Sequence, residues 1–195
     1  MPAAAWRSII LFVSGTVIVV VITVSVLAYL GFKRLNASLT SAPVVAANAV
    51  PCDQLEHTQI HYHAALQIFD HGNLVPIPTG VGRTGACFYW LHLHNGEPGI
   101  IHVEAPLART FTLGDFFQMW SMWSGEKQLI DSTHVSTLSA AGGDRLAVFV
   151  DEGNGPASYA GDPGDILLAE HEVITIEVGP PPAKAPPAYS WPPGF

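Results

Sequence analysis

The stretch CFYWLHLHNGEPGIIHVEA, residues 87–105, contains two alternating segments on either side of a turn. In residues 87–94 the leucines fall on one face and the histidines on the other. In residues 100–104 isoleucine and valine oppose a histidine and a glutamate. Such period-two alternation predicts two half-buried β-strands, and the intervening NGEPG, residues 95–99, predicts a five-residue hairpin loop.

This hairpin gathers ligand-type side chains on one face of the sheet. Pairing Ile100 with His94 places His102 directly opposite His92, with Cβ atoms about 5 Å apart. A register shifted by two residues instead places His102 opposite His94. In either register, strand parity keeps four side chains on one face, namely His92, His94, His102 and Glu104.

A third segment, residues 58–69, repeats the pattern. Its apolar face comprises Ile60, Tyr62, Ala64, Leu66 and Ile68, and the opposite face carries His61 and His63. Random placement of the nine histidines would give about 0.4 HxH pairs, against the two found. All three segments therefore turn ligand-type residues away from their apolar stripe.

Imidazole and carboxylate groups at this spacing suit a transition metal, here copper, zinc, iron or manganese. The predicted ligands are His61, His63, His92, His94, His102 and Glu104. The alternative is a polar sheet face whose histidines bond only to one another or to water. Because a solvated face would favour lysine, threonine and glutamate over histidine, the sequence favours the metal site.

The rest of the domain predicts a mainly β fold. Further strands are expected at residues 74–77, 146–151 and 172–178, and one helix at residues 113–123. Thr112 followed by Asp115 has the spacing of a capping box at the start of that helix. We expect an antiparallel β-sandwich or small barrel with one helix, in which the helix aromatic residues pack in the core.

The N-terminal part predicts a single transmembrane helix. Residues 9–30 contain no charge and no proline, and 22 residues at about 1.5 Å each can cross a bilayer core of about 30 Å. Basic residues flank both ends, so the positive-inside rule does not fix the orientation. We therefore expect an anchor over residues 1–34, a linker over 35–51 and one domain over 52–178.

Charge and cysteine content bear on the compartment and the partners. Three basic and no acidic residues precede Cys52, whereas five basic and sixteen acidic residues follow from there, a balance that excludes phosphate-driven nucleic-acid binding. Cys52 and Cys87 are the only cysteines, and a disulfide between them is expected in an oxidising compartment. Two unrelated buried thiols are the alternative. The disulfide favours placing the domain on the periplasmic, extracytoplasmic side of the cytoplasmic membrane.

The C-terminal tail, residues 179–195, contains seven prolines and predicts extended polyproline-like chain. It carries Tyr189, Trp191 and Phe195. Because a domain of this size is not expected to bury these aromatic groups, we expect them to dock on a partner.

Other site types fit less well. His92, His94 and Glu97 approach the cupin pattern of HxH followed by glutamate, but the glutamate comes one or two residues early and no second motif follows. A blue-copper site needs a late cysteine, which is absent from the sequence. The sequence also contains no nucleophile elbow, P-loop or dinucleotide fingerprint in its proper context.

The strings CDQLEHTQIHYHAALQIF, CFYWLHLHNGEPGIIHVEAP, FTLGDFFQMW and DILLAEHEVITIEVG resemble a largely uncharacterised prokaryotic family of small membrane-anchored, histidine-rich proteins. The resemblance covers residues 52–178 and implies an extracytoplasmic domain, with no enzyme activity to transfer. His92-Leu93-His94 stands where the family pattern reads HTH.

The sequence favours a non-catalytic role. We expect an accessory subunit that is anchored in the lipid bilayer and docks on a larger membrane complex. That complex would be an electron-transfer complex of photosynthesis or respiration. The alternative is a stand-alone metal-dependent oxidoreductase or metal-storage protein.

Overall fold

The structure is a computed structural model that describes residues 23, 24, 27, 49–181 and 183–195. Residues 23, 24 and 27 are helical. Nearly all of the predicted anchor and linker lies outside the described residues. Within the described part of the chain, no helix has the length and apolarity needed to cross a membrane.

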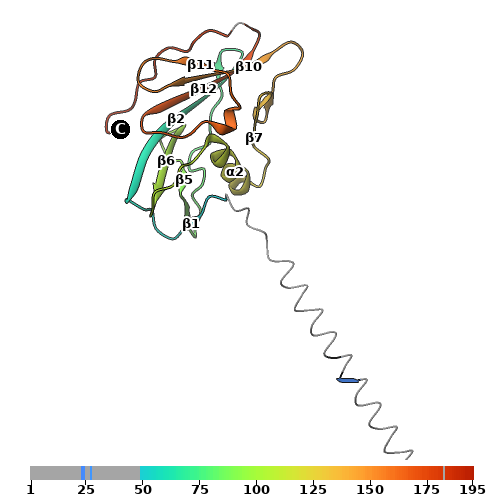
Figure 1. The fold of residues 1–195 in the computed structure, drawn as a ribbon, viewed down its shortest axis with the longest axis vertical. Coiled ribbons are helices and arrows are strands. Elements are labelled where there is room, and N and C mark those ends of the chain that lie inside the picture. The colour runs from blue at the N-terminus through green and yellow to red at the C-terminus, as the bar shows by residue number, and fades with distance from the viewer. Residues whose placement is uncertain (1–22, 25–26, 28–48, 182) are drawn as a thin grey trace, which may run out of the picture. The chain divides into compact units, whose positions relative to one another are not determined.

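The domain is built on one seven-stranded sheet (Figure 1). From edge to edge its strands are β11 (Ala157–Tyr159), β10 (Arg145–Asp151), β12 (Glu172–Gly179), β2 (Ile60–Asp70), β6 (Ile100–Ala105) and β5 (Leu91–His92), and β3 (Asn73–Leu74) pairs with β2. A two-stranded sheet joins β1 (Cys52–Asp53) to β4 (Phe88–Tyr89). A three-stranded sheet contains β7 (Leu129–Ile130), β8 (His134–Ser136) and β9 (Leu138–Ser139).

The mainly β class is confirmed, but the expected antiparallel sandwich or barrel is wrong in two respects. At the centre of the sheet β12 runs parallel to β2, from Glu172 opposite Ala64 to Val178 opposite Asp70, so the sheet is mixed. The strands described over residues 49–181 also form no closed barrel. Alternation predicts which residues share a face, but it carries no information on the direction of a partner about 100 residues away.

The histidine hairpin has the first of the two predicted registers, with Leu91 opposite Val103 and His92 opposite His102. The predicted strand over residues 87–94 is interrupted at Trp90, whose N–H donates to the Pro51 carbonyl at 3.0 Å. The chain therefore changes partners there, because β4 pairs with β1 and β5 pairs with β6.

The expected helix is α2 (Leu113–Ser124), and its capping box is present. Thr112 accepts a hydrogen bond from the Asp115 N–H, and the Asp115 carboxylate accepts one from the Thr112 N–H. The buried helix residues Leu113, Phe116, Phe117, Met119 and Trp120 join the hydrophobic core, as predicted. A 3-10 turn, η1 (Pro163–Asp165), packs near the helix.

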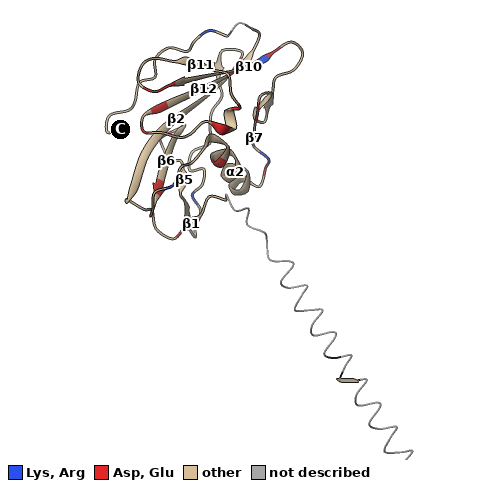
Figure 2. Cartoon of the chain, in the orientation of Figure 1, with Lys and Arg blue, Asp and Glu red and all other residues tan. Residues whose placement is uncertain are grey.

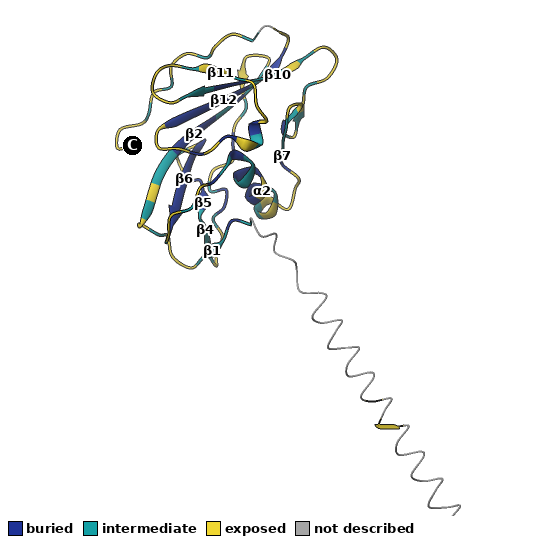
Figure 3. Cartoon of the chain, viewed as in Figure 1, coloured by how far each residue is buried: buried dark blue, intermediate teal, exposed yellow. Residues whose placement is uncertain are grey.

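The sheet has one apolar face and one mixed face. In register, β2, β6, β12 and β10 direct Leu66, Ile101, Ile174 and Val148 among others to the core face. The opposite face carries His61, His63, His102, Glu104, Thr175 and Phe149. The central strands are nevertheless largely buried (Figure 3), so the opposite face must also be covered.

The C-terminal tail provides part of this cover. Residues 184–187 line a common pocket with Phe69, Phe149 and Thr175 of the mixed face. Farther along, the Phe195 ring lies edge-on to His63, with centroids 4.8 Å apart, and the chain ends beside β2 (Figure 1). The tail aromatics thus find contacts within their own domain, contrary to the expectation that they could not. Docking of these residues on a partner stays a prediction.

Deletion of residues 180–195 tests this placement. Because the tail covers apolar and imidazole groups of the sheet, the deletion should lower the free energy of unfolding by at least about 1 kcal/mol, the scale of one partly buried aromatic side chain. Chemical denaturation of the full domain and the truncated domain would measure the loss. An unchanged midpoint would mean that the tail does not pack on the sheet.

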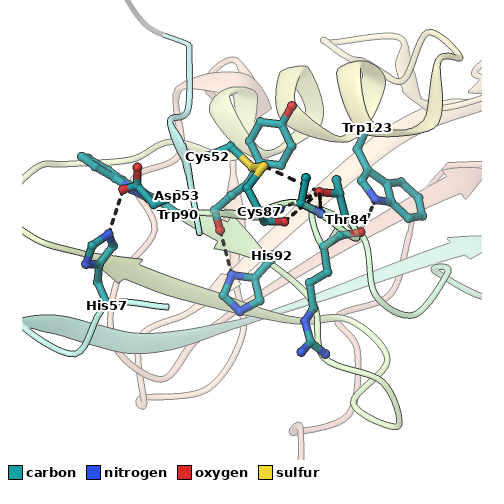
Figure 4. The surroundings of a disulfide bond; sticks show 11 residues. Cys52, Asp53, His57, Thr84, Cys87, Trp90, His92 and Trp123 are labelled. Atoms are coloured by element: carbon teal, nitrogen blue, oxygen red, sulfur yellow. Dashed lines mark hydrogen bonds and ion pairs between the residues drawn. A yellow bond between two sulfur atoms is a disulfide. The ribbon is translucent and has the colours of Figure 1, made fainter. Parts of the chain in front are cut away.

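The predicted disulfide between Cys52 and Cys87 is present, with Cα atoms 5.6 Å apart (Figure 4). It links β1 to the chain just before β4. The neighbouring Asp53 carboxylate accepts hydrogen bonds from Trp90 Nε1 at 2.7 Å and His57 Nε2 at 2.8 Å, which lower its pKa. These contacts fix the segment that follows Cys52 against β4 and β5.

Replacing both cysteines with serine should destabilise the domain by about 3–4 kcal/mol, because the unfolded chain regains the freedom of a loop of about 35 residues. Denaturation of the variant and of the oxidised parent protein, both without reductant, would measure the difference. In a second experiment with reductant, the parent protein should unfold at a denaturant concentration similar to that of the variant. A variant as stable as the oxidised parent protein would contradict this role of the disulfide.

Candidate metal centre

Three strands in register place three histidines in a row across the sheet. His63 on β2 lies opposite His102 on β6, and His102 lies opposite His92 on β5. His61 and His94 flank the row. The ligand atoms form two groups that share His102, and within each group they lie within 4.8 Å of one another: His92, His94, His102 and Glu104 in one, and His61, His63 and His102 in the other. Every predicted ligand therefore belongs to one cluster.

His102 lies at the centre of this cluster and is only 4% exposed. Its Nε2–H donates to Glu97 Oε2 at 2.7 Å, since a carboxylate can only accept. Its Nδ1 is buried without a hydrogen-bond partner, and the nearest acidic oxygen, Glu104 Oε1, lies 3.8 Å away. One imidazole nitrogen thus presents a free lone pair while a carboxylate holds the other, as in many metal-binding histidines.

His92 is oriented in the same manner by the backbone. Its Nδ1–H donates to the Tyr89 carbonyl at 2.8 Å, which leaves the lone pair on Nε2 (Figure 4). That Nε2 lies 3.0 Å from His94 Nε2. Gly82 permits the close approach of the preceding loop to this strand, because a Cβ at its φ of +78° would lie 2.6 Å from the Leu91 carbonyl.

Burial keeps three imidazoles of the cluster neutral. Desolvation, together with the neighbouring His102 and His61, lowers the pKa of His63 to about 4. Desolvation also lowers the pKa of His92 to about 4 and that of His94 below its usual value. At neutral pH these three imidazoles are therefore unprotonated, the form that binds metal.

Glu104 completes the cluster with a negative charge. It is 6% exposed, and burial alone would raise its pKa, but the contacts with His102, His92 and His61 lower the pKa instead. Its Oε1 lies 3.4 Å from His61 Nε2. The carboxylate is therefore ionised at neutral pH and available as an oxygen ligand.

Two carboxylates of the cluster did not appear among the predicted ligands. Glu97 lies in the hairpin loop and bonds to His102, and Glu56 lies after β1 with Oε1 3.5 Å from the Nε2 atoms of both His92 and His94. The sequence partly indicated that Glu97 belongs to the site, because Glu97 follows the HxH pair at nearly the cupin spacing. It contained no such indication for Glu56, because the position of Glu56 depends on the disulfide-linked segment.

No protein-family model, no curated protein and no solved structure matches this chain.

A second buried carboxyl group lies away from the cluster. Glu172 begins β12 on the core face, is 4% exposed and has an Oε2 without a hydrogen-bond partner. It borders a cavity of about 640 Å³ between β10, β11 and the chain after η1. Burial raises the pKa of Glu172 to about 7, and the Glu152 charge adds to this effect.

This shift predicts a specific pH dependence. Between pH 4.5 and 7 the folded chain holds a proton on Glu172 that the unfolded chain releases, so the contribution of this group to stability decreases as the pH rises. Glu172→Gln should therefore stabilise the domain by about 1–2 kcal/mol at pH 8 and by much less at pH 5. Denaturation at both pH values, with the exposed Glu170→Gln as control, would measure it. Equal effects at the two pH values would contradict the shift.

Proposed function

We propose that this chain is an extracytoplasmic metal-binding protein whose histidine cluster holds a transition-metal ion. The observation that carries the proposal is the unpartnered His102 Nδ1. A buried nitrogen without a hydrogen bond costs about 1–3 kcal/mol, and a bond to a metal would offset that cost. The ligand atoms of His102, two further imidazoles (His92 and His94) and one carboxylate (Glu104) lie within 4.8 Å of one another.

The donor set restricts the metal. Neutral imidazoles with one carboxylate suit zinc, copper, iron or manganese, whereas calcium and magnesium prefer oxygen ligands alone. The acidic surroundings also favour a cation. Acidic residues outnumber basic ones over the domain (Figure 2), and Glu56, Glu97 and Glu104 all approach the cluster. A bound ion would supply a Lewis-acid or redox centre.

The disulfide supports the proposed location. Disulfides persist in oxidising compartments, and Cys52–Cys87 lies directly after the predicted anchor and linker. We therefore propose a domain held at the outer side of the cytoplasmic membrane by residues 1–34. The resemblance to membrane-anchored, histidine-rich proteins is consistent with this location.

A non-catalytic accessory role on a larger membrane complex is the second candidate. It needs a docking element, and the exposed Leu55, Leu74 and Leu107 of the domain are apolar groups available to a partner. The aromatic residues of the tail are weaker support for docking on a partner than the sequence alone indicates. Trp191 contacts His171 and Phe195 contacts His63, both within the same domain.

Metal analysis of the purified full chain tests the proposal. The protein should retain stoichiometric metal after desalting, and excess metal should raise its melting temperature. At a free metal concentration of 100 times the dissociation constant, the free energy of unfolding should increase by about 2.7 kcal/mol. His102→Gln should reduce both the bound metal and the stabilisation, because glutamine has no imidazole nitrogen to replace Nδ1.

His134→Gln is the matched control, since His134, on β8, bonds to Asp131 and belongs to neither ligand group. It should bind metal as the parent protein does. A parent protein that binds no transition metal, or a His102→Gln variant that binds it unchanged, would refute the proposed function.

A further inference from the structure

The histidine cluster divides into two sets of donors. His92 and His94 present their Nε2 atoms to each other at 3.0 Å, and their rings are inclined by only 18°. His63, by contrast, stands at 68° to His61 and 87° to His102. The two sets therefore differ in the arrangement of their rings, and the Nε2–Nε2 distance rather than the ring inclination brings the first pair together.

Glu56 forms a compact triangle with the first pair. Its Oε1 lies 3.5 Å from His92 Nε2 and 3.5 Å from His94 Nε2, and the two nitrogens are 3.0 Å apart. Ligands about 2.0–2.1 Å from a tetrahedral ion lie about 3.3–3.4 Å from one another. The three atoms therefore have the spacing of one triangular face of a tetrahedral metal site.

Other groups leave this triangle open to an ion. The Tyr89 carbonyl accepts a hydrogen bond from His92 Nδ1–H, so His92 Nε2 carries the ring's lone pair. Without an ion this lone pair accepts a hydrogen bond from His94 Nε2–H, which a bound metal would replace. Arg83 Nη2 lies 3.7 Å from Glu56 Oε1, too far for a hydrogen bond that would occupy that oxygen. The disulfide and the Asp53–Trp90 bond hold the segment that carries Glu56.

The second set of donors comprises His61, His63, His102 and Glu104 and does not need Glu56. The free Nδ1 of His102 and the Nε2 of His61 lie 3.8 and 3.4 Å from the same oxygen, Glu104 Oε1. His63 forms a group with His61 and His102 whose ligand atoms lie within 4.8 Å of one another. His102 cannot serve both sets through two nitrogens, because Glu97 holds its Nε2.

From these contacts we infer that the cluster binds two ions, one by Glu56, His92 and His94, and one by His61, His63, His102 and Glu104. The inference rests on the proposed metal-binding function and adds Glu56 to its ligands. Two of the three protein ligands at the first ion are histidines and the third is a carboxylate, so one or more of its positions remain open to water or to a small ligand.

The number of ions per chain tests the inference. The full chain is stripped with a chelator, loaded with excess Zn²⁺, desalted and analysed for metal and protein. We expect two ions per chain in the parent protein. Glu56→Gln should retain one, because its amide oxygen lacks the charge of the carboxylate, and a variant with both His61→Gln and His63→Gln should also retain one.

Glu126→Gln is the control for a lost surface charge, since Glu126 is exposed after α2, and it should retain two ions. Circular dichroism of each metal-free variant would verify folding. One ion per chain in the parent protein would overturn the two-ion inference and leave the proposed function standing. No bound ion would overturn both, and two ions in Glu56→Gln would exclude Glu56 as a ligand.

Discussion

The strand register that aligns His63, His102 and His92 is the constraint on which the rest of the site depends. Two antiparallel pairings, β2 with β6 and β6 with β5, put these residues opposite one another. A shift of one residue in either pairing would turn one or more imidazoles to the apolar side. The same register turns Ile101 and Val103 into the core, so the hydrophobic effect that stabilises the sheet also assembles the cluster.

Burial makes this cluster chemically distinct from a polar sheet surface. Exposed histidines would titrate near pH 6.5, whereas desolvation lowers the pKa of His63 and His92 to about 4. Water-filled surroundings would also satisfy the His102 Nδ1, which here has no partner. Glu97 and the Tyr89 carbonyl hold one nitrogen each of His102 and His92, so the orientation of both rings, and of the lone pair on the other nitrogen, is set before any ion binds.

Local sequence patterns predicted which six histidine and glutamate residues gather on one face, the hairpin with two possible registers of which one is present, and the helix with its capping box, because each depends on neighbours close in sequence. These patterns could not predict the parallel pairing of β2 with β12, which joins strands far apart in the chain. The place of Glu56 in the cluster and the packing of Phe195 on His63 were not predicted, for a related reason. Both residues lie outside the strands, and their positions depend on the disulfide and on the packing of the tail.

The coordination of a bound ion is the most direct measure of the central claim. X-ray absorption spectra of the Zn²⁺-loaded full chain would report the atoms around the metal. The account predicts a first shell of nitrogen and oxygen at about 2.0–2.1 Å, together with the outer-shell scattering of several imidazole rings. A shell of oxygen alone, without imidazole scattering, would place the metal on surface carboxylates and contradict a histidine centre.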